Sequence, residues 1–316
     1  MKNPILETKS QRILFSPLNW GFGHVSRSIE LIRLLVQNHN KIFVCCNEIQ
    51  AAIYTQYFFS EEIEIIRFDG YPFSFKAGES FALSLIKSSL SIVQFMKKER
   101  KQVEELCKEL SIDLVLSDHR YGFKTDKVKS VFITHQLQLP VNKIQMIGNR
   151  IHQRLIRKFD EIWIVDEKER PLAGYLSKAT DRILNSTFHI GHLSRFSYDC
   201  NEEKKNIINY LLIVSGPKEH WQELIQQYEK QFSKEEVLVL MPFKQDLNLP
   251  IKWKIHIATN WVESDRLIIG AENILGYCGY STLMDLKTLN KSAKFLIPCK
   301  GQLEQEYLYK YNLLSK

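Results

Sequence analysis

Short apolar runs alternate along the chain with longer stretches that have the periodicity of amphipathic helices. The runs are rich in Val, Ile, Leu and Phe, as is typical of strands buried on both faces of a parallel sheet. The strands predicted first cover 12–17, 41–46, 63–68, 113–118, 130–135, 161–166 and 188–193. Helices are predicted near 25–38, 49–59, 81–110 and 142–159. The pattern therefore predicts an α/β domain built from repeated strand–helix units.

A polar stretch without periodicity, SRFSYDCNEEKKN at 194–206, is the best candidate for a linker. The alternation then resumes, with a helix expected over EHWQELIQQYEKQF. The later strands are predicted at 210–216, 237–242, 254–258, 273–279 and 294–298. Domains are therefore expected at 1–195 and 205–316. Both should be doubly wound α/β domains, facing each other across a cleft at the carboxyl ends of their strands, where such folds bind ligands.

Composition narrows the possible partners. The 316 residues are 44% hydrophobic, and a net charge of +7 favours anionic partners such as nucleotides or phospholipid surfaces. Nucleic acid is not expected, because the basic residues do not cluster with aromatics on a recognisable module. No apolar run could span a membrane and no signal peptide is evident, so a cytoplasmic protein is expected. The six cysteines form no CxxC pair, which predicts reduced thiols without zinc.

The stretch GFGHVSR follows the first strand and carries a histidine where the next helix should begin. Gly21 and Gly23 would let the backbone approach a ligand, and the helix N-terminus would offer amides to an anion. Ser26 replaces the third glycine of the dinucleotide fingerprint, which argues against a dehydrogenase. His24 could act as a general base, a role that typically contributes about 10²- to 10⁴-fold to a rate. The alternative is a tight turn with a histidine that serves only the structure.

A general base needs a partner that orients its ring. Asp118 ends a predicted strand at the same edge of the sheet, so it could hold His24 in one tautomer and stabilise the imidazolium. An aspartate in this place can also be only a turn former or a helix cap. His119 and His135, at the ends of neighbouring strands, are rival bases.

The second domain offers two places where backbone amides could hold an anion. Ser215 and Gly216 lie between a strand and a helix. A second junction of this kind consists of Gly279, Tyr280, Ser281 and Thr282. Simple capping of the helix by Ser281 or Thr282 is the alternative there. Asp285, one turn into the helix, could cap the same end or accept hydrogen bonds from the hydroxyls of a sugar.

The motifs of metal-dependent and kinase-type phosphate chemistry are missing from the sequence. It contains no Asp-x-Asp and no GxxxxGK[ST]. The charge of a leaving diphosphate would then be met by amides, helix dipoles and basic side chains. The expectation is a transfer or hydrolysis site without a metal or cofactor.

Several motifs together resemble a known family. They are PLNWGFGHVSR (17–27), SDHRYGF (117–123), VFITHQL (131–137), IGHLSRF (190–196), SGP (215–217), GYSTLMDL (279–286) and PCKGQLEQEYL (298–308). In this order they resemble the family 28 group of GT-B glycosyltransferases, which includes the N-acetylglucosaminyltransferase of peptidoglycan lipid synthesis. The chain is most similar to bacterial predicted glycosyltransferases with a PLxWGxGHxxR signature.

The resemblance implies a GT-B fold of two Rossmann-like domains and a nucleoside diphosphate sugar donor. The donor would be UDP-linked, for instance UDP-N-acetylglucosamine, and held mainly by the second domain, while the first binds the acceptor. His24 matches the histidine of the family's first glycine loop, its usual candidate base, and Arg27 closes the same signature as an expected substrate contact. The resemblance implies further contacts with the donor. Trp261 and Val262 would lie near the nucleobase, the GYST turn near the diphosphate, and Asp285, Gln302 and Gln305 near the ribose or sugar.

The sequence also departs from the family pattern. Arg-Ser before GYST is replaced by Tyr277 and Cys278, and Gln-Arg after SGP by His220 and Trp221. The chain ends soon after QEYLYKYNLL, where many relatives continue with a further helix. Donor affinity or activity could therefore be reduced. The alternatives to a transferase are a nucleotide-sugar hydrolase of the same fold, which carries a similar GxGHxxR turn, and a degenerate nucleotide-sugar-binding module.

The acceptor is a glycan or a lipid-linked molecule in this interpretation. The helix VNKIQMIGNRIHQRLIRKF bears an apolar stripe of Ile144, Ile147, Ile151 and Leu155, flanked by Lys143, Arg150, Arg154, Arg157 and Lys158. The stripe either faces the core with a solvated basic face beside it, or contacts an anionic membrane surface. In the second case the protein would be peripheral on the inner face of the membrane, near a lipid-linked acceptor.

Overall fold

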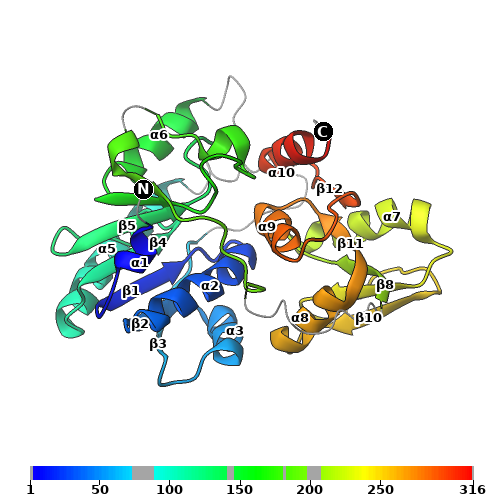
Figure 1. Cartoon of the computed structure of the whole chain (residues 1–316), viewed down its shortest axis with the longest axis horizontal. Helices are drawn as coiled ribbons and strands as arrows, with labels where there is room; N and C mark the ends of the chain where they lie inside the picture. The colour runs from blue at the N-terminus through cyan, green and yellow to red at the C-terminus, as the bar shows by residue number, and fades with distance from the viewer. Residues whose placement is uncertain (1–2, 73–88, 141–145, 181–182, 198–207, 315–316) are drawn as a thin grey trace. The chain divides into compact units, whose positions relative to one another are not determined.

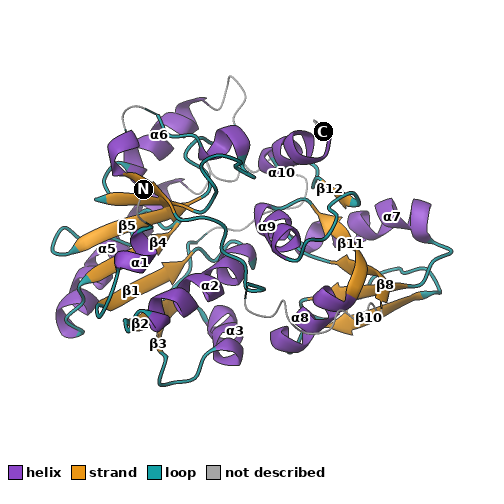
Figure 2. Cartoon of the chain, viewed as in Figure 1, coloured by secondary structure: helices purple, strands orange, loops and turns teal. Residues whose placement is uncertain are grey.

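The computed structural model describes residues 3–72, 89–140, 146–180, 183–197 and 208–314. The chain divides into two compact units, Met1–Leu193 and Ser194–Lys316 (Figure 1). Each contains its own sheet, and every pairing between the described strands is parallel, as expected (Figure 2). Ser194 and Arg195 belong to the second unit, two residues earlier than the predicted boundary. Among the described helices, none is long and apolar enough to cross a lipid bilayer.

Seven strands form the sheet of unit 1, in the order β3-β2-β1-β4-β5-β6-β7. Their bounds are β1 Arg12–Pro17, β2 Lys41–Cys46, β3 Ile63–Arg67, β4 Leu114–Asp118, β5 Lys129–Thr134, β6 Glu161–Ile164 and β7 Thr187–His189. The inner strands β1 and β4 are buried almost throughout, because helices cover both faces of a doubly wound sheet. All seven strands were predicted from the apolar runs.

The described helices of unit 1 are α1 Pro4–Glu7, α2 Gly23–Gln37, α3 Glu48–Tyr57, α5 Ser89–Glu109 and α6 Met146–Ile156, with short 3₁₀ turns η2 Gly174–Ser177 and η3 Leu184–Ser186. Four of these helices (α2, α3, α5 and α6) lie where the periodicity predicted helices, whereas α1, before the first strand, was not predicted. Asn47 and Gln50 form a capping box that starts α3, so this boundary is set locally. The predicted helical segments 81–88 and 142–145 lie outside the described residues.

The strand order of unit 1 sets the place of its loops. The chain runs outward from β1 to β2 and β3 on one side, then returns to place β4 on the other side of β1. Pro17 at the end of β1 lies opposite Asp118 at the end of β4. The loops that follow these two strands therefore meet at the carboxyl edge, at the point where the order reverses, which is where doubly wound folds bind ligands.

Unit 2 has a five-stranded sheet in the order β10-β9-β8-β11-β12. The strands are β8 Ile208–Ile213, β9 Val237–Met241, β10 Trp253–Ile257, β11 Ala271–Tyr277 and β12 Leu296–Ile297. The helices are η4 Lys218–His220, α7 Trp221–Phe232, α8 Trp261–Gly270, α9 Tyr280–Thr288, α10 Leu303–Tyr309 and the terminal turn η5 Lys310–Leu314. Helix α8 was not predicted. The order reverses between β8 and β11, so the carboxyl ends of these strands form an edge of the kind at which doubly wound folds bind ligands.

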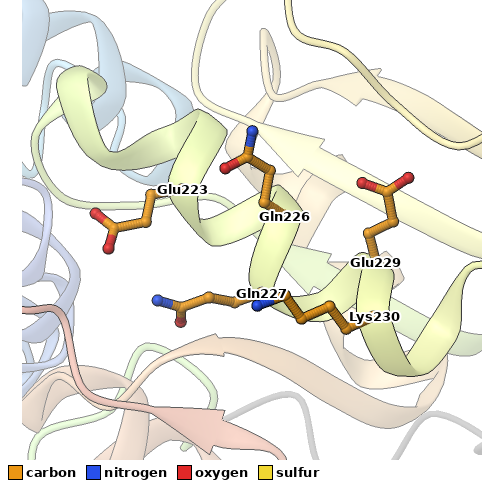
Figure 3. A pocket seen from close by; sticks show the side chains of 5 residues that line it. All are labelled: Glu223, Gln226, Gln227, Glu229 and Lys230. Atoms are coloured by element: carbon orange, nitrogen blue, oxygen red, sulfur yellow. The ribbon is translucent and has the colours of Figure 1, made fainter.

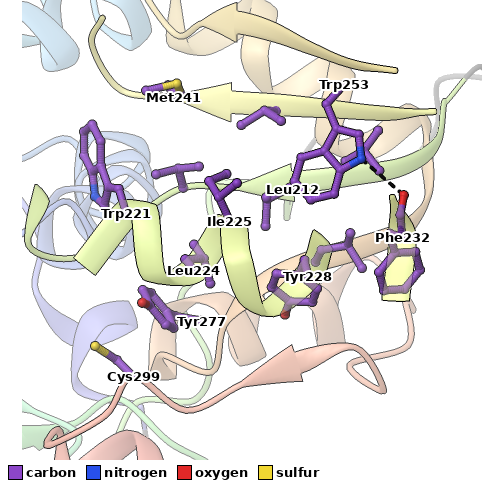
Figure 4. Close-up of a cluster of buried hydrophobic side chains, with 14 residues drawn as sticks. Leu212, Trp221, Leu224, Ile225, Tyr228, Phe232, Met241, Trp253, Tyr277 and Cys299 are labelled. Carbon is purple, nitrogen blue, oxygen red and sulfur yellow. Dashed lines mark hydrogen bonds between the residues drawn. The ribbon is translucent and has the colours of Figure 1, made fainter. Parts of the chain in front are cut away.

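One apolar face of α7 provides much of the core of unit 2. Trp221, Ile225, Tyr228 and Phe232 recur at helical spacing and are all buried (Figure 4). They pack against residues of β8, β9 and β11. The indole of Trp253 also donates a hydrogen bond to the carbonyl of Phe232 at 3.2 Å. Unit 2 is therefore stabilised by burial within its own residues.

Candidate functional site

The turn after β1 brings a histidine to the start of α2. Gly21 has a φ of 99°, a left-handed conformation that glycine adopts without steric cost. Helix α2 begins at Gly23, and the side chain of its N-cap residue, Phe22, makes no capping hydrogen bond. His24 follows in the first turn, where backbone amides have no acceptor within the helix.

Asp118, the last residue of β4, faces this histidine. Nδ1 of His24 lies 3.0 Å from Oδ2 of Asp118, the contact that the sequence analysis expected. Arg27 donates from Nε to the same oxygen at 3.0 Å and from Nη2 to Oδ1. The side chains of Asp118 and Arg27 are 2% and 3% exposed, against 15% for His24. The guanidinium of Arg27 is thus buried and bonded to Asp118. It is not exposed for the contact with substrate that the sequence analysis expected.

The surroundings of this pair shift the pKa of both groups. Burial is the largest influence on His24 and lowers its pKa below 6.5, with Asp118 opposing the shift and Arg27 adding to it. Burial alone would raise the pKa of Asp118, but Arg27 and His24 outweigh it and hold that pKa well below its usual range. At neutral pH the pair is therefore an uncharged imidazole backed by a carboxylate, as a general base requires.

His119 continues the site directly after Asp118. Its φ of 61° is unusual for a residue other than glycine, and strain of this kind is concentrated at functional sites. Its ring meets the ring of His24 edge-on at 5.6 Å between centroids, and its Nε2 lies 3.3 Å from Oγ1 of Thr134. Burial, followed by the proximity of the ionisable His24 ring and of Arg27, lowers the pKa of His119 well below its usual range. His119 is thus a second uncharged imidazole beside the first.

Two further histidines lie behind these groups. Nδ1 of His135 is 2.8 Å from Nη1 of Arg27, and because a guanidinium only donates, His135 accepts here and carries its proton on Nε2. His152 of α6 donates from Nε2 to the carbonyl of Gln136 and accepts from the hydroxyl of Tyr121 at Nδ1. Burial lowers the pKa of His152 to about 4. Both rings are buried, so neither is placed to meet a substrate directly.

A metal ion is the obvious alternative occupant for such a cluster. Ligand atoms of His24, Asp118 and His119 all lie within 4.8 Å of one another. However, Arg27 already donates to both oxygens of Asp118 and lies 2.8 Å from Nδ1 of His24. A cation placed there would face the positive charge of the guanidinium. The donor set therefore favours proton transfer over metal binding.

A buried ion pair that sequence reasoning missed supports the strained turn. Nε of Arg120 donates to Glu99 at 2.6 Å, and neither side chain is more than 1% exposed. Arg120 also donates to the carbonyl of Asp69, and the hydroxyl of Tyr71 donates to the second oxygen of Glu99. These bonds join α5 to the loops after β3 and β4. They fix the backbone immediately next to His119.

Unit 2 has two turns at the carboxyl ends of adjacent strands. Ser215 and Gly216 follow β8, and Gly216 takes a left-handed φ of 75°. After β11, Gly279 is the N-cap of α9 and has no side chain with which to cap the helix. Ser281 and Thr282, the capping residues considered in the sequence analysis, are the second and third residues of the helix. Their amides lie in the first turn, where helices leave donors for an anion.

The fold matches solved structures, although neither a protein-family model nor a curated protein matches the sequence. A structure described as the glycotransferase of kitacinnamycin has 14% identity and a TM-score of 0.62, and the match covers 94% of this chain and 83% of the other. Phytolacca americana UGT2, complexed with UDP-2fluoro-glucose and pterostilbene, has 12% identity and a TM-score of 0.63, over 96% and 83% of the two chains. The S. aureus MnaA–UDP structure has 11% identity and a TM-score of 0.60, over 96% and 89%.

The chain has the GT-B fold. The spinosyn rhamnosyltransferase SpnG supports the same assignment, with 10% identity and a TM-score of 0.60 over 96% of this chain and 92% of that one. The two α/β units of the present chain, each with a reversal of strand order, agree with this fold. The class predicted from the sequence is thus confirmed.

In this GT-B chain Asp285 neither caps α9 nor faces solvent. Ser194 donates to its Oδ1 at 2.6 Å and Arg195 to its Oδ2 at 2.8 Å, and the residue is 7% exposed. Arg195 also donates to Asp265 at 2.7 Å, and its guanidinium lies over the ring of Trp261. The predicted capping is therefore wrong. Both oxygens that were expected to meet a sugar are engaged by the first residues of unit 2.

The residues that depart from the family pattern are mostly core residues. Tyr277 is 3% exposed and donates from its hydroxyl to the carbonyl of His220. Trp221 is 1% exposed and donates from its indole to the carbonyl of Gly216. Tyr280, which was expected to contact substrate, is 3% exposed. These three side chains belong to the buried interior of unit 2.

The other predicted donor contacts lie at the starts of two helices. Trp261 and Val262 begin α8, and Val262 is 37% exposed. Gln302 is the N-cap of α10, and its Oε1 accepts from Nε2 of Gln305 at 2.7 Å. Oε1 of Gln305 accepts from the amide of Cys299 at 2.9 Å. The Gln305 amide is thus already used within its own loop.

Of the apolar stripe predicted on α6, Ile151 is turned away from the core and Leu155 is partly buried. Ile151 is 54% exposed, whereas His152 and Ile156 are buried. The buried face is therefore shifted by one residue, because the polar bonds of His152 hold it inside the unit. The side chains of Ile144 and Ile147 lie outside the described part of the chain.

A hollow along the outer face of α7 is unrelated to these turns. It is lined by Glu223, Gln226, Gln227, Glu229 and Lys230 (Figure 3). These side chains lie on the face of the helix opposite the core. None of them was predicted to bind a ligand, and we interpret the hollow as solvated helix surface.

Proposed function

We propose that the protein is an inverting, metal-independent glycosyltransferase that moves a sugar from a nucleoside diphosphate to a hydroxyl of a glycan or lipid-linked acceptor. The donor is a UDP-sugar, for instance UDP-N-acetylglucosamine. The observation that carries this proposal is the pair of His24 and Asp118 at the carboxyl edge of unit 1, within a GT-B fold. Solved structures with this fold include one with UDP-2fluoro-glucose and one with UDP, which supports a uridine nucleotide here.

His24 acts as the general base. With Nδ1–H donated to Asp118, the lone pair of Nε2 is available to take the proton of the acceptor hydroxyl. The acceptor oxygen then attacks the anomeric carbon as the bond from that carbon to the diphosphate breaks, and the nucleoside diphosphate leaves with the electron pair. Asp118 stabilises the imidazolium that results. Its carboxylate remains ionised, because its pKa is held so low.

The donor is held by the turns of unit 2. The amides of Ser281 and Thr282 at the start of α9, and the left-handed turn at Gly216, supply donors for the diphosphate. Trp261 lies at the start of α8, where its ring could stack on the base. Arg195 lies over the same ring and donates to the carboxylates of Asp265 and Asp285, so its guanidinium is held in place by three contacts.

The first test is nucleoside diphosphate release from UDP-, TDP-, GDP- and ADP-sugars, with and without a lipid and glycan extract. We expect release from a UDP-sugar that needs the extract and falls about 10²- to 10⁴-fold in His24→Ala. His256→Ala, on β10 of unit 2, is the matched control and should keep the full rate.

The other outcomes separate the alternatives. Equal release without the extract would identify a hydrolase that uses water in place of the acceptor. Nucleotide binding without release from any donor would identify a binding module. Equal rates in His24→Ala and the unaltered protein would remove His24 from the mechanism.

A further inference from the structure

Arg27 occupies a position that the general-base mechanism leaves unexplained. It lies one turn after His24 on α2, buried, and its three guanidinium nitrogens all have partners. Nε and Nη2 donate to the two oxygens of Asp118, Nη1 donates to Nδ1 of His135, and Nη2 lies 2.8 Å from Nδ1 of His24. This side chain therefore contacts Asp118, His24 and His135 at once.

The contacts at Nδ1 of His24 compete with one another. Asp118 can only accept a hydrogen bond from this atom, whereas Arg27 can only donate one. A proton on Nδ1 satisfies Asp118 and leaves Nε2 as the base. A lone pair on Nδ1 satisfies Arg27 and places the proton on Nε2, which then cannot take another from a hydroxyl. A protonated ring would lie beside a permanent positive charge at 2.8 Å.

We propose that Arg27 is a positioning residue that keeps His24 uncharged, by neutralising Asp118 and by opposing a positive charge on the neighbouring ring. The proposal rests on the function proposed above, since an uncharged His24 is what a base at neutral pH requires. Without Arg27, Asp118 would be an unbalanced buried carboxylate 3.0 Å from the imidazole and would favour its protonation. The site would then hold an imidazolium, which has no lone pair for the acceptor.

The other titratable groups around His24 do not replace this effect. His119, from the loop after β4, meets its ring edge-on, and His135, from the end of β5, lies beyond Arg27. His119 is uncharged at neutral pH, because its own pKa is held low. Asp118 on β4 and Arg27 on α2 are thus the two charged groups with the largest effect on His24, and His135 adds a smaller effect in the same direction as Arg27.

Nuclear magnetic resonance of the ¹⁵N-labelled histidine rings in the free protein tests the proposal without substrate. In Arg27→Met we expect the pKa of His24 to rise by about one unit or more, the size of effect that one neighbouring charge produces. We also expect the proton of the neutral ring to move fully to Nδ1, because Asp118 is then its one strong partner. His152 provides an internal reference, since its two bonds do not involve Arg27.

A second route covers the case in which Arg27→Met does not fold because Asp118 is left without its partner. Asp118→Asn and the double variant Asp118→Asn with Arg27→Met carry no unbalanced carboxylate. The pKa of His24 should be higher in the double variant than in Asp118→Asn, because Arg27 alone opposes the charged ring there. A His24 pKa that stays the same in both comparisons overturns the proposal.

The proposal can fail independently of the proposed function. A loss of turnover in His24→Ala with no effect of Arg27 on the His24 pKa would retain the base and remove the role of Arg27. A shifted pKa with turnover that survives in His24→Ala would retain the role of Arg27 and remove the base.

Discussion

His24 combines three features that a catalytic imidazole needs: partial exposure, a carboxylate partner and a lowered pKa. Each follows from a different part of unit 1. The glycine turn after β1 leaves the ring partly exposed, β4 supplies Asp118, and the buried surroundings with Arg27 disfavour the charged form. The low pKa matters because a base that is protonated at neutral pH cannot accept a proton.

The pH dependence of the reaction follows from this shift. Because the pKa of His24 lies below 6.5, kcat/KM should stay constant through neutral pH. It should fall about tenfold per pH unit only once the pH drops below that pKa. In Asp118→Asn the acid limb should move to still lower pH, since Asp118 raises the pKa of His24. Steady-state kinetics between pH 4 and 8 would measure both profiles, and an acid limb above pH 7 would contradict this assignment.

Helix α5 and the loops after β3 and β4 depend on one buried ion pair. Glu99 and Arg120 are almost fully buried, and each makes a further hydrogen bond inside unit 1. Burying two charges costs desolvation energy, so the pair does not by itself add much stability. Its geometry instead fixes the backbone of the loop that carries His119.

Removing one partner of the Glu99–Arg120 pair should therefore lower the free energy of unfolding much more than replacing both partners. Glu99→Ala should lower the free energy of unfolding by about 3–5 kcal/mol, because Arg120 would remain buried without its counter-charge. The double variant Glu99→Met with Arg120→Met should recover most of this loss. Urea denaturation followed by circular dichroism would measure all three proteins. Equal losses in the single and double variants would show that packing, not charge, dominates here.

Helix α6 and the residue that follows it present basic side chains next to one exposed apolar side chain. Arg150, Arg154 and Arg157 are exposed, and Ile151 is 54% exposed among them. An anionic lipid surface is attracted to such clustered positive charge and accepts an apolar side chain.

We expect the protein to bind vesicles that contain anionic lipid and to be released by high salt, because screening weakens this attraction. The triple variant with alanine at positions 150, 154 and 157 should lose most of this binding. A matched control replaces the exposed Lys230, Lys234 and Lys252 of unit 2 with alanine, which removes the same charge elsewhere. Sedimentation with phosphatidylglycerol vesicles measures binding. An equal loss of binding in both variants would show that only the net charge of the protein matters, and not the position of the arginines.

Each unit of the chain has its own sheet, its own buried core and its own point of strand-order reversal. A ligand held by unit 2 stabilises the folded chain by mass action, whatever happens at unit 1. Stability measurements can therefore test the donor independently of turnover. This is useful because the acceptor is not needed for such an experiment.

UDP at about 100 times its Kd should stabilise the fold by about 2.7 kcal/mol, and ADP or GDP at the same concentration by much less. Trp261→Ala should reduce the stabilisation by UDP, because it removes the ring expected near the uracil base. Glu229→Ala, on the outer face of α7, is the control and should leave it unchanged (Figure 3). Thermal melts with each nucleotide would provide the comparison. An equal response to all three nucleotides would contradict recognition of uracil.

Several features missed by sequence analysis nevertheless left a signal. Helix α8 starts with Asn260, whose side chain accepts from the amide of Glu263, and Asn followed three residues later by Glu is a recognisable helix start. Glu99 lies four residues after Phe95 and four before Val103, so a charge interrupts an apolar stripe at helical spacing. No comparable local signal pointed to the contact between Arg195 and Asp285, which are 90 residues apart.

The sequence by itself determined the strands, most helices and the two glycine turns, because periodicity and turn chemistry act over a few residues. It also indicated that His24 and Asp118 lie at one edge, since His24 follows one strand of a parallel sheet and Asp118 ends another. Only the tertiary structure decided which strand ends are neighbours, and hence that Arg27 faces Asp118 while Asp285 faces Arg195. Long-range contacts of this kind depend on strand order and on the pairing of buried charges, which no short stretch of sequence specifies.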